Sequence, residues 1–156
     1  MIKHIAKHTK VVFSEIPDEI TLALNITNCQ NNCIGCHSSF LKQDIGEEVT
    51  ESVLDKYIKN NTGITCICFM GEGNDRNSLI SMIKWIKKHH SNIKIALYSG
   101  RMDVEGDLWE LLDYIKLGPY IPEYGPLNKE TTNQTMWKIE NGVRKDITSK
   151  FWKKID

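Results

Sequence analysis

Short apolar runs that alternate with helical patterns constrain the fold of this chain more than any other feature. Runs at residues 20–26, 64–70 and 93–98 are rich in apolar and β-branched residues and have the length of buried strands. Between them the spacing of apolar residues changes to the helical period. The sequence therefore predicts an α/β protein with a parallel sheet, and such sheets bind ligands at the carboxyl ends of their strands.

The helical spacing also predicts where individual helices lie. A helix is expected over 51–59, with Thr50 as its N-cap, and a second over 76–89. A third, shorter helix is expected over 107–114, before a strand-like piece at 114–118.

The C-terminal part of the chain has a different pattern. Two alternating segments within 135–147 flank Asn141-Gly142, a dipeptide typical of two-residue hairpin turns. An antiparallel hairpin is therefore expected there. The preceding stretch, 121–134, has no periodic pattern and is expected to be a surface loop.

Size and charge limit the classes of function. The chain has 156 residues, of which 40% are hydrophobic, so residues 1–156 are expected to form one domain. Its 20 basic residues balance its 20 acidic ones, which argues against a nucleic acid or a membrane as partner and favours a small metabolite or another protein. No apolar stretch has the length of a signal peptide or a membrane span, so a cytoplasmic location is expected.

Three of the five cysteines lie close together in one polar run. Cys29, Cys33 and Cys36 have the spacing C-x3-C-x2-C and follow directly on the first predicted strand. In a reducing compartment such groups more often bind metal or take part in chemistry than form disulfides. A four-iron cluster held by protein alone needs four thiolates, so three would leave one iron open to a substrate or cofactor.

Other uses of these cysteines are open at this point. A zinc site of the three cysteines and His37 has suitable ligand types, although the adjacent Cys36 and His37 would strain to reach one tetrahedral ion. A disulfide framework is disfavoured by the compartment, and inert buried thiols do not explain so polar a run.

The spacing of these cysteines resembles the motif of the radical S-adenosylmethionine enzymes. The resemblance implies that the three thiolates hold a 4Fe-4S cluster whose free iron chelates the amino and carboxylate groups of S-adenosylmethionine. It also implies that the reduced cluster donates an electron that cleaves the sulfonium and yields a 5'-deoxyadenosyl radical.

Residues around the motif narrow the resemblance. The run CIGCH, residues 33–37, is similar to the small activating enzymes of anaerobic (class III) ribonucleotide reductase. Further similar stretches follow in the family's order from about Val11 to Trp152: SEIPDEITLALNIT, HSSFLKQDIGEE, FMGEGND, IALYSG, IKLGPYI and PLNKETTNQTMWKI. The resemblance implies a partial (β/α) barrel of the radical S-adenosylmethionine type. It implies two partners, the catalytic subunit of the reductase, on which a glycyl radical would be generated, and an external electron donor of the flavodoxin or ferredoxin type.

The same resemblance implies which residues contact S-adenosylmethionine. They lie beside the cysteines and after the second and third predicted strands: Gly35, His37, Gly71, Glu72, Gly73 and Ser99. The family usually has Gly-Gly-Glu after the second strand, where this chain has Met-Gly-Glu-Gly at 70–73. Either the methionine replaces the first glycine or the order of glycine and glutamate is exchanged. In both cases glycine permits a close approach of the backbone, and the carboxylate can accept hydrogen bonds from an ammonium group.

Several other residues are assigned no chemistry. Cys66 and Cys68 alternate along the second predicted strand and are interpreted as core thiols on one of its faces. Most of the histidines are expected to be exposed: His4, His8, His89 and His90. Turn and cap chemistry explains the polar stretch 128–134. A more specific hypothesis is that this stretch docks the partner protein.

Two other functions compete with activation of the reductase. Another radical S-adenosylmethionine enzyme, which activates a different glycyl-radical enzyme or modifies a small substrate, would have the same cluster. A non-enzymatic metal-binding module would use the same cysteines without cleaving S-adenosylmethionine.

Overall fold

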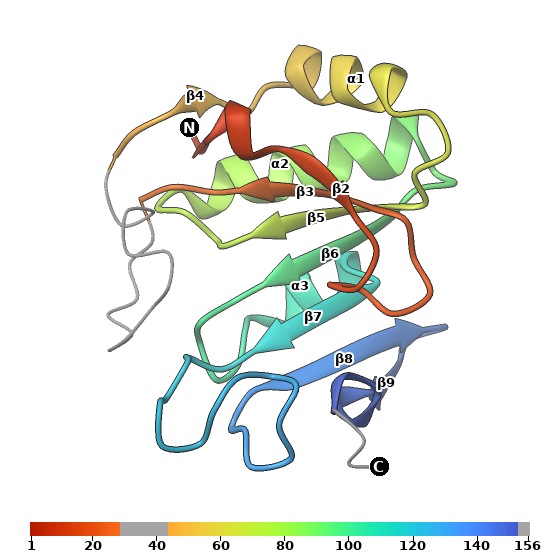
Figure 1. Ribbon diagram of the computed structural model, residues 1–156. Coiled ribbons are helices and arrows are strands. Elements are labelled where there is room, and N and C mark those ends of the chain that lie inside the picture. Colours follow the sequence, from red (N-terminus) through yellow and green to blue (C-terminus); the bar gives the residue numbers. More distant parts are fainter. Residues whose placement is uncertain (29–43, 153–156) are drawn as a thin grey trace.

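The main sheet has seven strands within residues 1–28 and 44–152, which the computed structural model describes. They lie in the order β2-β3-β5-β6-β7-β8-β9 (Figure 1). Their bounds are β2 Lys10–Val12, β3 Thr21–Asn25, β5 Cys66–Met70, β6 Lys94–Tyr98, β7 Tyr114–Leu117, β8 Thr135–Glu140 and β9 Val143–Asp146. The central strands β3, β5, β6 and β7 are parallel, whereas β2, β8 and β9 pair antiparallel with their neighbours. A separate two-stranded sheet joins β1 (Lys3–His4) to β4 (Glu47–Glu48).

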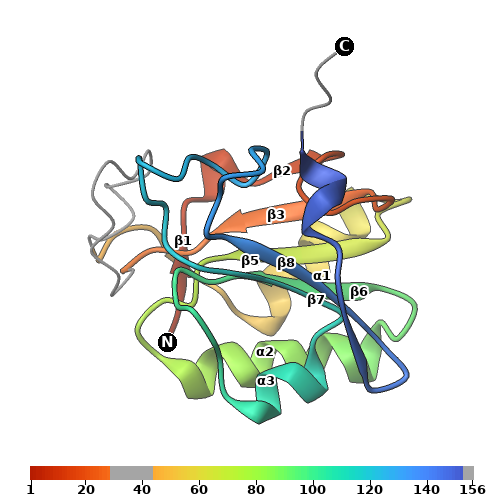
Figure 2. The ribbon, with the colours of Figure 1, turned by 90° about the horizontal axis from the view of Figure 1, so that it is seen from below.

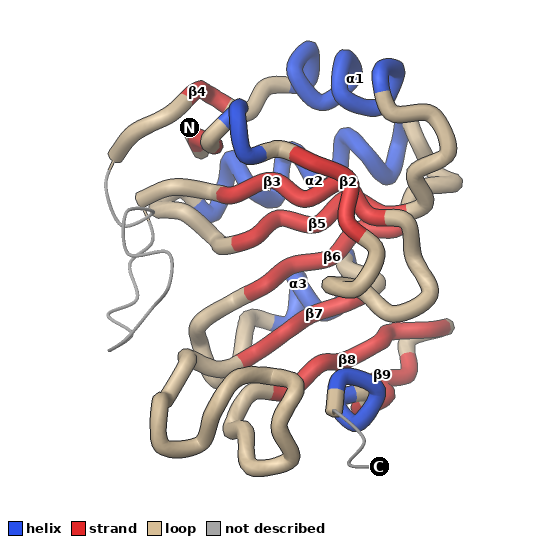
Figure 3. Tube along the Cα trace, viewed as in Figure 1, coloured by secondary structure: helices blue, strands red, loops and turns tan. Residues whose placement is uncertain are grey.

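The helices are distributed unequally between the two faces of the main sheet. α1 (Glu51–Asn60), α2 (Arg76–His89) and α3 (Gly106–Leu111) lie on one face, and the 3-10 helix η3 (Thr148–Phe151) lies on the other (Figure 2). α2 joins β5 to β6 and α3 joins β6 to β7, so helices and strands alternate along the chain (Figure 3). A second 3-10 helix, η1 (Ala6–His8), follows β1. Within residues 1–28 and 44–152, no helix combines the length and the apolar character needed to cross a lipid bilayer.

Side chains of the parallel strands alternate between two apolar cores. On the helix side, Ile67 and Phe69 of β5 are fully buried in a cluster with apolar residues of α1, α2 and α3. On the opposite side, Cys66 and Cys68 are fully buried in a cluster that includes Tyr114. This period of two is that of a strand buried on both faces, and each large apolar side chain so buried stabilises the fold by roughly 1.5–3 kcal/mol. The prediction that both cysteines are core thiols on one face is confirmed.

Most helices and turns lie where the sequence predicts them. α2 spans the predicted residues 76–89. Thr50 Oγ1 accepts a hydrogen bond from the backbone N–H of Val53 at 3.2 Å, which confirms Thr50 as the N-cap of α1. β8 and β9 form the predicted hairpin, and Asn141 and Gly142 have the φ angles of +51° and +77° that its turn requires.

The third helix is shorter than predicted. It ends at Leu111 instead of continuing to Tyr114, which is already the first residue of β7. The cause is Asp113, whose carboxylate accepts a hydrogen bond from the backbone N–H of Ile95 at 2.9 Å and whose own N–H donates to the Ile95 carbonyl. These two bonds dock the chain on β6 and end the helix early.

The prediction that His4 is exposed is wrong. His4 is fully buried, with Nδ1 2.9 Å from the carbonyl oxygen of Glu47 and Nε2 2.6 Å from the hydroxyl of Tyr57. Both ring nitrogens therefore have a polar partner between β4 and α1, and the imidazole is buried without an unsatisfied nitrogen. His8 and His89 are exposed as predicted, and His90 is partly buried.

Candidate active site

The carboxyl ends of three neighbouring parallel strands meet at one edge of the sheet. Asn25 of β3 lies beside Met70 of β5, and Met70 lies beside Tyr98 of β6. The chain that leaves β3 therefore runs next to the turns that follow β5 and β6. The predicted cluster ligands and their neighbours lie outside the residues that the structure describes: Cys29, Cys33, Gly35, Cys36 and His37.

The N-terminal segment links the described residues on either side of 29–43. The backbone N–H of Thr27 donates a hydrogen bond to the carbonyl of Lys3 at 2.9 Å, and the Thr27 hydroxyl donates to the carbonyl of Ile45 at 2.7 Å. The ammonium group of Lys3 forms an ion pair with Asp44 at 3.1 Å. These bonds fix residues 27 and 44–45 relative to one another at the carboxyl end of β3.

Gly71 and Gly73 let the turn after β5 pack closely against the end of β3. Their φ angles are +120° and +69°, which glycine adopts without strain. A Cβ on Gly71 would lie 3.4 Å from the carbonyl oxygen of Ile26, and one on Gly73 would lie 3.1 Å from a methyl carbon of Ile26. Glycine at both positions therefore brings this turn against the chain just before Cys29.

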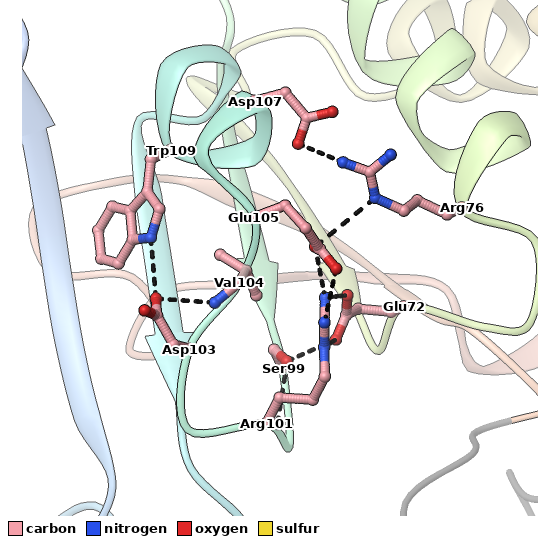
Figure 4. Close-up of polar contacts among 9 residues, drawn as sticks. All are labelled: Glu72, Arg76, Ser99, Arg101, Asp103, Val104, Glu105, Asp107 and Trp109. Carbon is pink, nitrogen blue, oxygen red and sulfur yellow. Dashed lines mark hydrogen bonds and ion pairs between the residues drawn. The ribbon is translucent and has the colours of Figure 1, made fainter.

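Glu72, between these glycines, directs its carboxylate toward the end of β6 (Figure 4). Its Oε2 accepts hydrogen bonds from the Ser99 hydroxyl at 2.6 Å and from Nε of Arg101 at 2.9 Å, and its Oε1 accepts one from Nη2 of Arg101 at 2.5 Å. Ser99 is buried, and its Oγ accepts a hydrogen bond from the backbone N–H of Arg101 at 3.1 Å. A closed ring of hydrogen bonds thus joins the turns after β5 and β6.

Arg101 extends the network toward α3 and α2. Its Nη1 and Nη2 each donate to one carboxylate oxygen of Glu105 at 2.9 Å. Glu105 also lies 3.6 Å from Nε of Arg76, and Arg76 pairs with Asp107. Hydrogen bonds to Glu105 and then Glu72 raise the pKa of Arg101 above its ordinary value, and the bond from Arg101 lowers the pKa of Glu105 to about 2.

The sheet edge at the carboxyl ends of β5 and β6 brings together four of the predicted contacts of S-adenosylmethionine: Gly71, Glu72, Gly73 and Ser99. Comparison of the chain with protein-family models, curated proteins and solved structures gave no match. A functional assignment therefore rests on these residues, on their geometry and on the cysteine spacing.

Arg101, which the sequence-based prediction does not include, lies at the centre of the site. It contacts Ser99, Glu72 and Glu105 at once. One signal in the sequence points toward it, because it follows a predicted strand by a few residues.

Metal-binding side chains are not grouped within the described part of the chain. Within 1–28 and 44–152, no three or more His, Cys, Asp or Glu side chains are grouped so that they could hold a metal ion. Burial raises the pKa of the Cys66 thiol to about 12 and that of Cys68 well above its ordinary value. Because the thiolate is the form that binds metal, these two strand cysteines are poor ligands.

A hollow of about 470 Å³ opens beside Tyr98, the last residue of β6. Its lining includes the apolar side chains of Leu127 and Phe151 and the charged residues Glu15 and Lys150. Sites for small molecules have volumes of roughly 300–1,000 Å³, so the hollow has room for a group of nucleoside size near the carboxyl end of β6.

One local bond and one bond to a more distant segment hold the polar stretch 128–134. The backbone N–H of Gln134 donates to the hydroxyl of Thr132 at 3.0 Å, and Nδ2 of Asn133 donates to the carbonyl of Pro119 at 3.0 Å. Turn chemistry accounts for the first contact, and the second joins the stretch to the chain after β7. A role of this stretch in docking a partner protein stays a prediction.

Proposed function

We propose that this protein is a radical S-adenosylmethionine activating enzyme that generates a glycyl radical on the catalytic subunit of an anaerobic ribonucleotide reductase. One observation carries the proposal: β3, the last strand before the C-x3-C-x2-C motif in the sequence, ends at the same sheet edge where β5 leads into Gly71-Glu72-Gly73 and β6 into Ser99. In this proposal the parallel strands β3, β5, β6 and β7 belong to a partial (β/α) barrel.

The described residues at this edge fit S-adenosylmethionine. Gly71 and Gly73 pack the turn closely against Ile26 and so hold Glu72, which lies between them, at this edge. Oε1 of Glu72 accepts one hydrogen bond from the described residues, and a carboxylate oxygen has about two acceptor positions, so an ammonium group can bind there. Gly35 and His37 are expected to add contacts beside the cysteines.

The chain and its cofactors have separate roles. Cys29, Cys33 and Cys36 would supply three thiolates to a 4Fe-4S cluster and leave one iron for S-adenosylmethionine. When bound and reduced by one electron from a flavodoxin- or ferredoxin-type donor, these groups supply the reductive cleavage that leads to removal of a hydrogen atom from a glycine Cα of the partner. The chain binds and orients S-adenosylmethionine, with Glu72 directed at its amino group.

Anaerobic reconstitution with iron and sulfide tests the enzymatic assignment. The protein should become brown and should form 5'-deoxyadenosine and methionine from S-adenosylmethionine only when dithionite is present. Alanine at position 29, 33 or 36 should abolish the cleavage. Cys66→Ala and Cys68→Ala are the matched controls and should retain most of it, because both thiols are buried in the core. A saturated zinc centre and no 5'-deoxyadenosine in oxygen-free protein would exclude the assignment.

The partner assignment has its own test. The reconstituted protein, S-adenosylmethionine, dithionite and a purified anaerobic ribonucleotide reductase should together give the electron paramagnetic resonance signal of a glycyl radical on the reductase. Cleavage of S-adenosylmethionine without that signal would favour a radical enzyme that acts on a different substrate.

A further inference from the structure

We propose that Arg101 is a positioning residue, whose guanidinium fixes the Glu72 carboxylate in the orientation that receives the ammonium group of S-adenosylmethionine. This inference rests on the proposed function and adds a residue to it. Its basis is the hydrogen-bond geometry around Glu72 and the charge of the surrounding network (Figure 4).

The guanidinium holds Glu72 through two bonds at once. Nε donates to Oε2 and Nη2 donates to Oε1, so position and rotation of the carboxylate are both defined. A rigid fork of this kind is particular to arginine, because the ammonium of lysine acts as a single point of charge. The Ser99 hydroxyl adds a further bond to Oε2 at 2.6 Å. Ser99 and Arg101 thus occupy both acceptor positions of Oε2. Of the two acceptor positions of Oε1, the described residues occupy one, and the other can receive a ligand.

A second edge of the same guanidinium, which shares Nη2 with the first, is held by Glu105. Both carboxylate oxygens of Glu105 accept hydrogen bonds from Arg101 at 2.9 Å. Glu105 is the N-cap residue of α3 and lies 3.6 Å from Nε of Arg76, the first residue of α2. The guanidinium is therefore held from two sides, and its place is set by the starts of two helices.

The network carries an excess of negative charge. It contains the three carboxylates of Glu72, Glu105 and Asp107 against the two guanidiniums of Arg76 and Arg101. Arg76 contacts both Glu105 and Asp107, whereas Glu72 contacts Arg101, which it shares with Glu105. A further cation can be accommodated at Glu72, whose Oε1 accepts one hydrogen bond from the described residues, and the ammonium group of S-adenosylmethionine supplies it.

Equilibrium dialysis of S-adenosylmethionine against the reconstituted holoprotein, without reductant, tests the proposal. Arg101→Gln should raise Kd roughly 10- to 100-fold, as for the loss of a charge-assisted hydrogen bond. Arg101→Lys keeps the charge but lacks the fork, and should lose most of the affinity as well. Arg144→Gln is the matched control, because Arg144 lies on β9 over the ring of Trp109 and does not belong to this network, and its Kd should change by less than about threefold.

A double-mutant cycle separates positioning from a general structural role. In the Glu72→Gln background, Arg101→Gln should have little further effect on Kd, because both changes remove the same interaction. Iron content and melting temperature are measured for every variant. Both should stay near the wild-type values, since ion pairs between partners as exposed as Arg101 and Glu105 contribute little to stability.

Several outcomes would overturn the positioning role. Wild-type affinity in Arg101→Gln or Arg101→Lys would do so, as would additive losses in the cycle, and the proposed function would stand as long as the wild type binds and cleaves S-adenosylmethionine. If Arg101→Gln fails to take up the cluster, Glu105→Gln replaces it and removes the second anchor of the guanidinium. Weaker binding would then support the role, and unchanged binding would refute it. A wild-type protein that neither binds S-adenosylmethionine nor forms 5'-deoxyadenosine would refute the proposed function itself.

Discussion

Two polar contacts at opposite ends of the parallel strands differ in the groups that they join. At the amino ends, the side chains of Thr65 and Asp113 bond to the backbone. Thr65 Oγ1 accepts a hydrogen bond from the backbone N–H of Ile20 at 2.9 Å, and the Asp113 carboxylate accepts one from the N–H of Ile95 at 2.9 Å. At the carboxyl ends, Glu72 bonds instead to other side chains, those of Ser99 and Arg101.

The difference separates stability from binding. Ile95 is fully buried, and a buried backbone group that loses its partner costs about 1–3 kcal/mol, so the bond from its N–H to Asp113 stabilises the fold. At the carboxyl ends the Arg101–Glu105 pair is exposed, with 38% and 44% of the two side chains accessible, and such ion pairs contribute only about 0–1 kcal/mol to stability. We therefore expect the amino ends to be closed to reagents and the carboxyl ends to accept new partners.

The largest effect that we expect from closed amino ends is a low reactivity of the buried thiols. Cys66 is the first residue of β5, is fully buried, and has a pKa raised by burial to about 12. Its thiolate fraction at neutral pH should be roughly 10³-fold below that of an exposed cysteine. In a protein with serine at positions 29, 33 and 36, a thiol reagent such as dithionitrobenzoate should label Cys66 and Cys68 only after denaturation. Rapid labelling in native buffer would show that the amino ends are open.

Glycine substitution compares turns at opposite ends of β5. Gly63, before the strand, and Gly73, after it, have φ angles of +93° and +69°, so alanine strains the backbone at both positions. Space is available at Gly63, where no atom lies within 4 Å of an added Cβ, whereas at Gly73 the Cβ would lie 3.1 Å from Ile26 and 3.2 Å from Ile2. Urea denaturation should show a loss of roughly 1 kcal/mol for Gly63→Ala and roughly 2–4 kcal/mol for Gly73→Ala. Equal losses would show that close packing at the carboxyl end is unimportant.

Regular elements are predictable from the sequence where they are long enough to show a period. β3, β5 and β6 are short apolar runs, and α1 and α2 repeat their apolar residues at helical spacing. β1, β2 and β4 have two or three residues each, too few for any period. The burial of His4 is not predictable for a different reason: it depends on Glu47 and Tyr57, which lie 43 and 53 residues away in the sequence.

The candidate site is predictable only where it follows directly on a strand. The resemblance to the activating enzymes implies Glu72 and Ser99 as contacts, and the apolar runs that end just before them predict that both follow strands. Arg101 acts through Glu72, 29 residues earlier, and one sequence contains no signal for a contact at that separation. That Cys29, Cys33 and Cys36 are cluster ligands stays a prediction from their spacing.

Removal of Asp113 tests the role of the amino ends. Asp113→Ala leaves the backbone N–H of Ile95 without its side-chain acceptor and should lower the free energy of unfolding by about 1–3 kcal/mol. Affinity for S-adenosylmethionine should not change, because Asp113 lies at the opposite end of β6 from Ser99. Asp107→Ala is the control, since it removes an exposed carboxylate and should cost less than about 1 kcal/mol. If Asp113→Ala had wild-type stability but bound S-adenosylmethionine more weakly, Asp113 would serve binding rather than stability.

Acid titration should change stability least of all these tests, because the Arg101–Glu105 pair is exposed. Arg101 lowers the pKa of Glu105 from an ordinary value of 4.5 to about 2. Since the pKa is lower in the folded protein than in the unfolded chain, the stabilisation from Glu105 is fully present above about pH 4.5 and is lost as the pH falls toward 2. Glu105→Gln does not titrate, so its difference in melting temperature from the wild type should shrink over this window. Solvent screening keeps that difference small, because 44% of the Glu105 side chain is exposed. A constant difference between pH 6 and pH 2 would show that Arg101 does not pair with Glu105 in solution, and the guanidinium would then lack the second anchor that positioning of Glu72 requires.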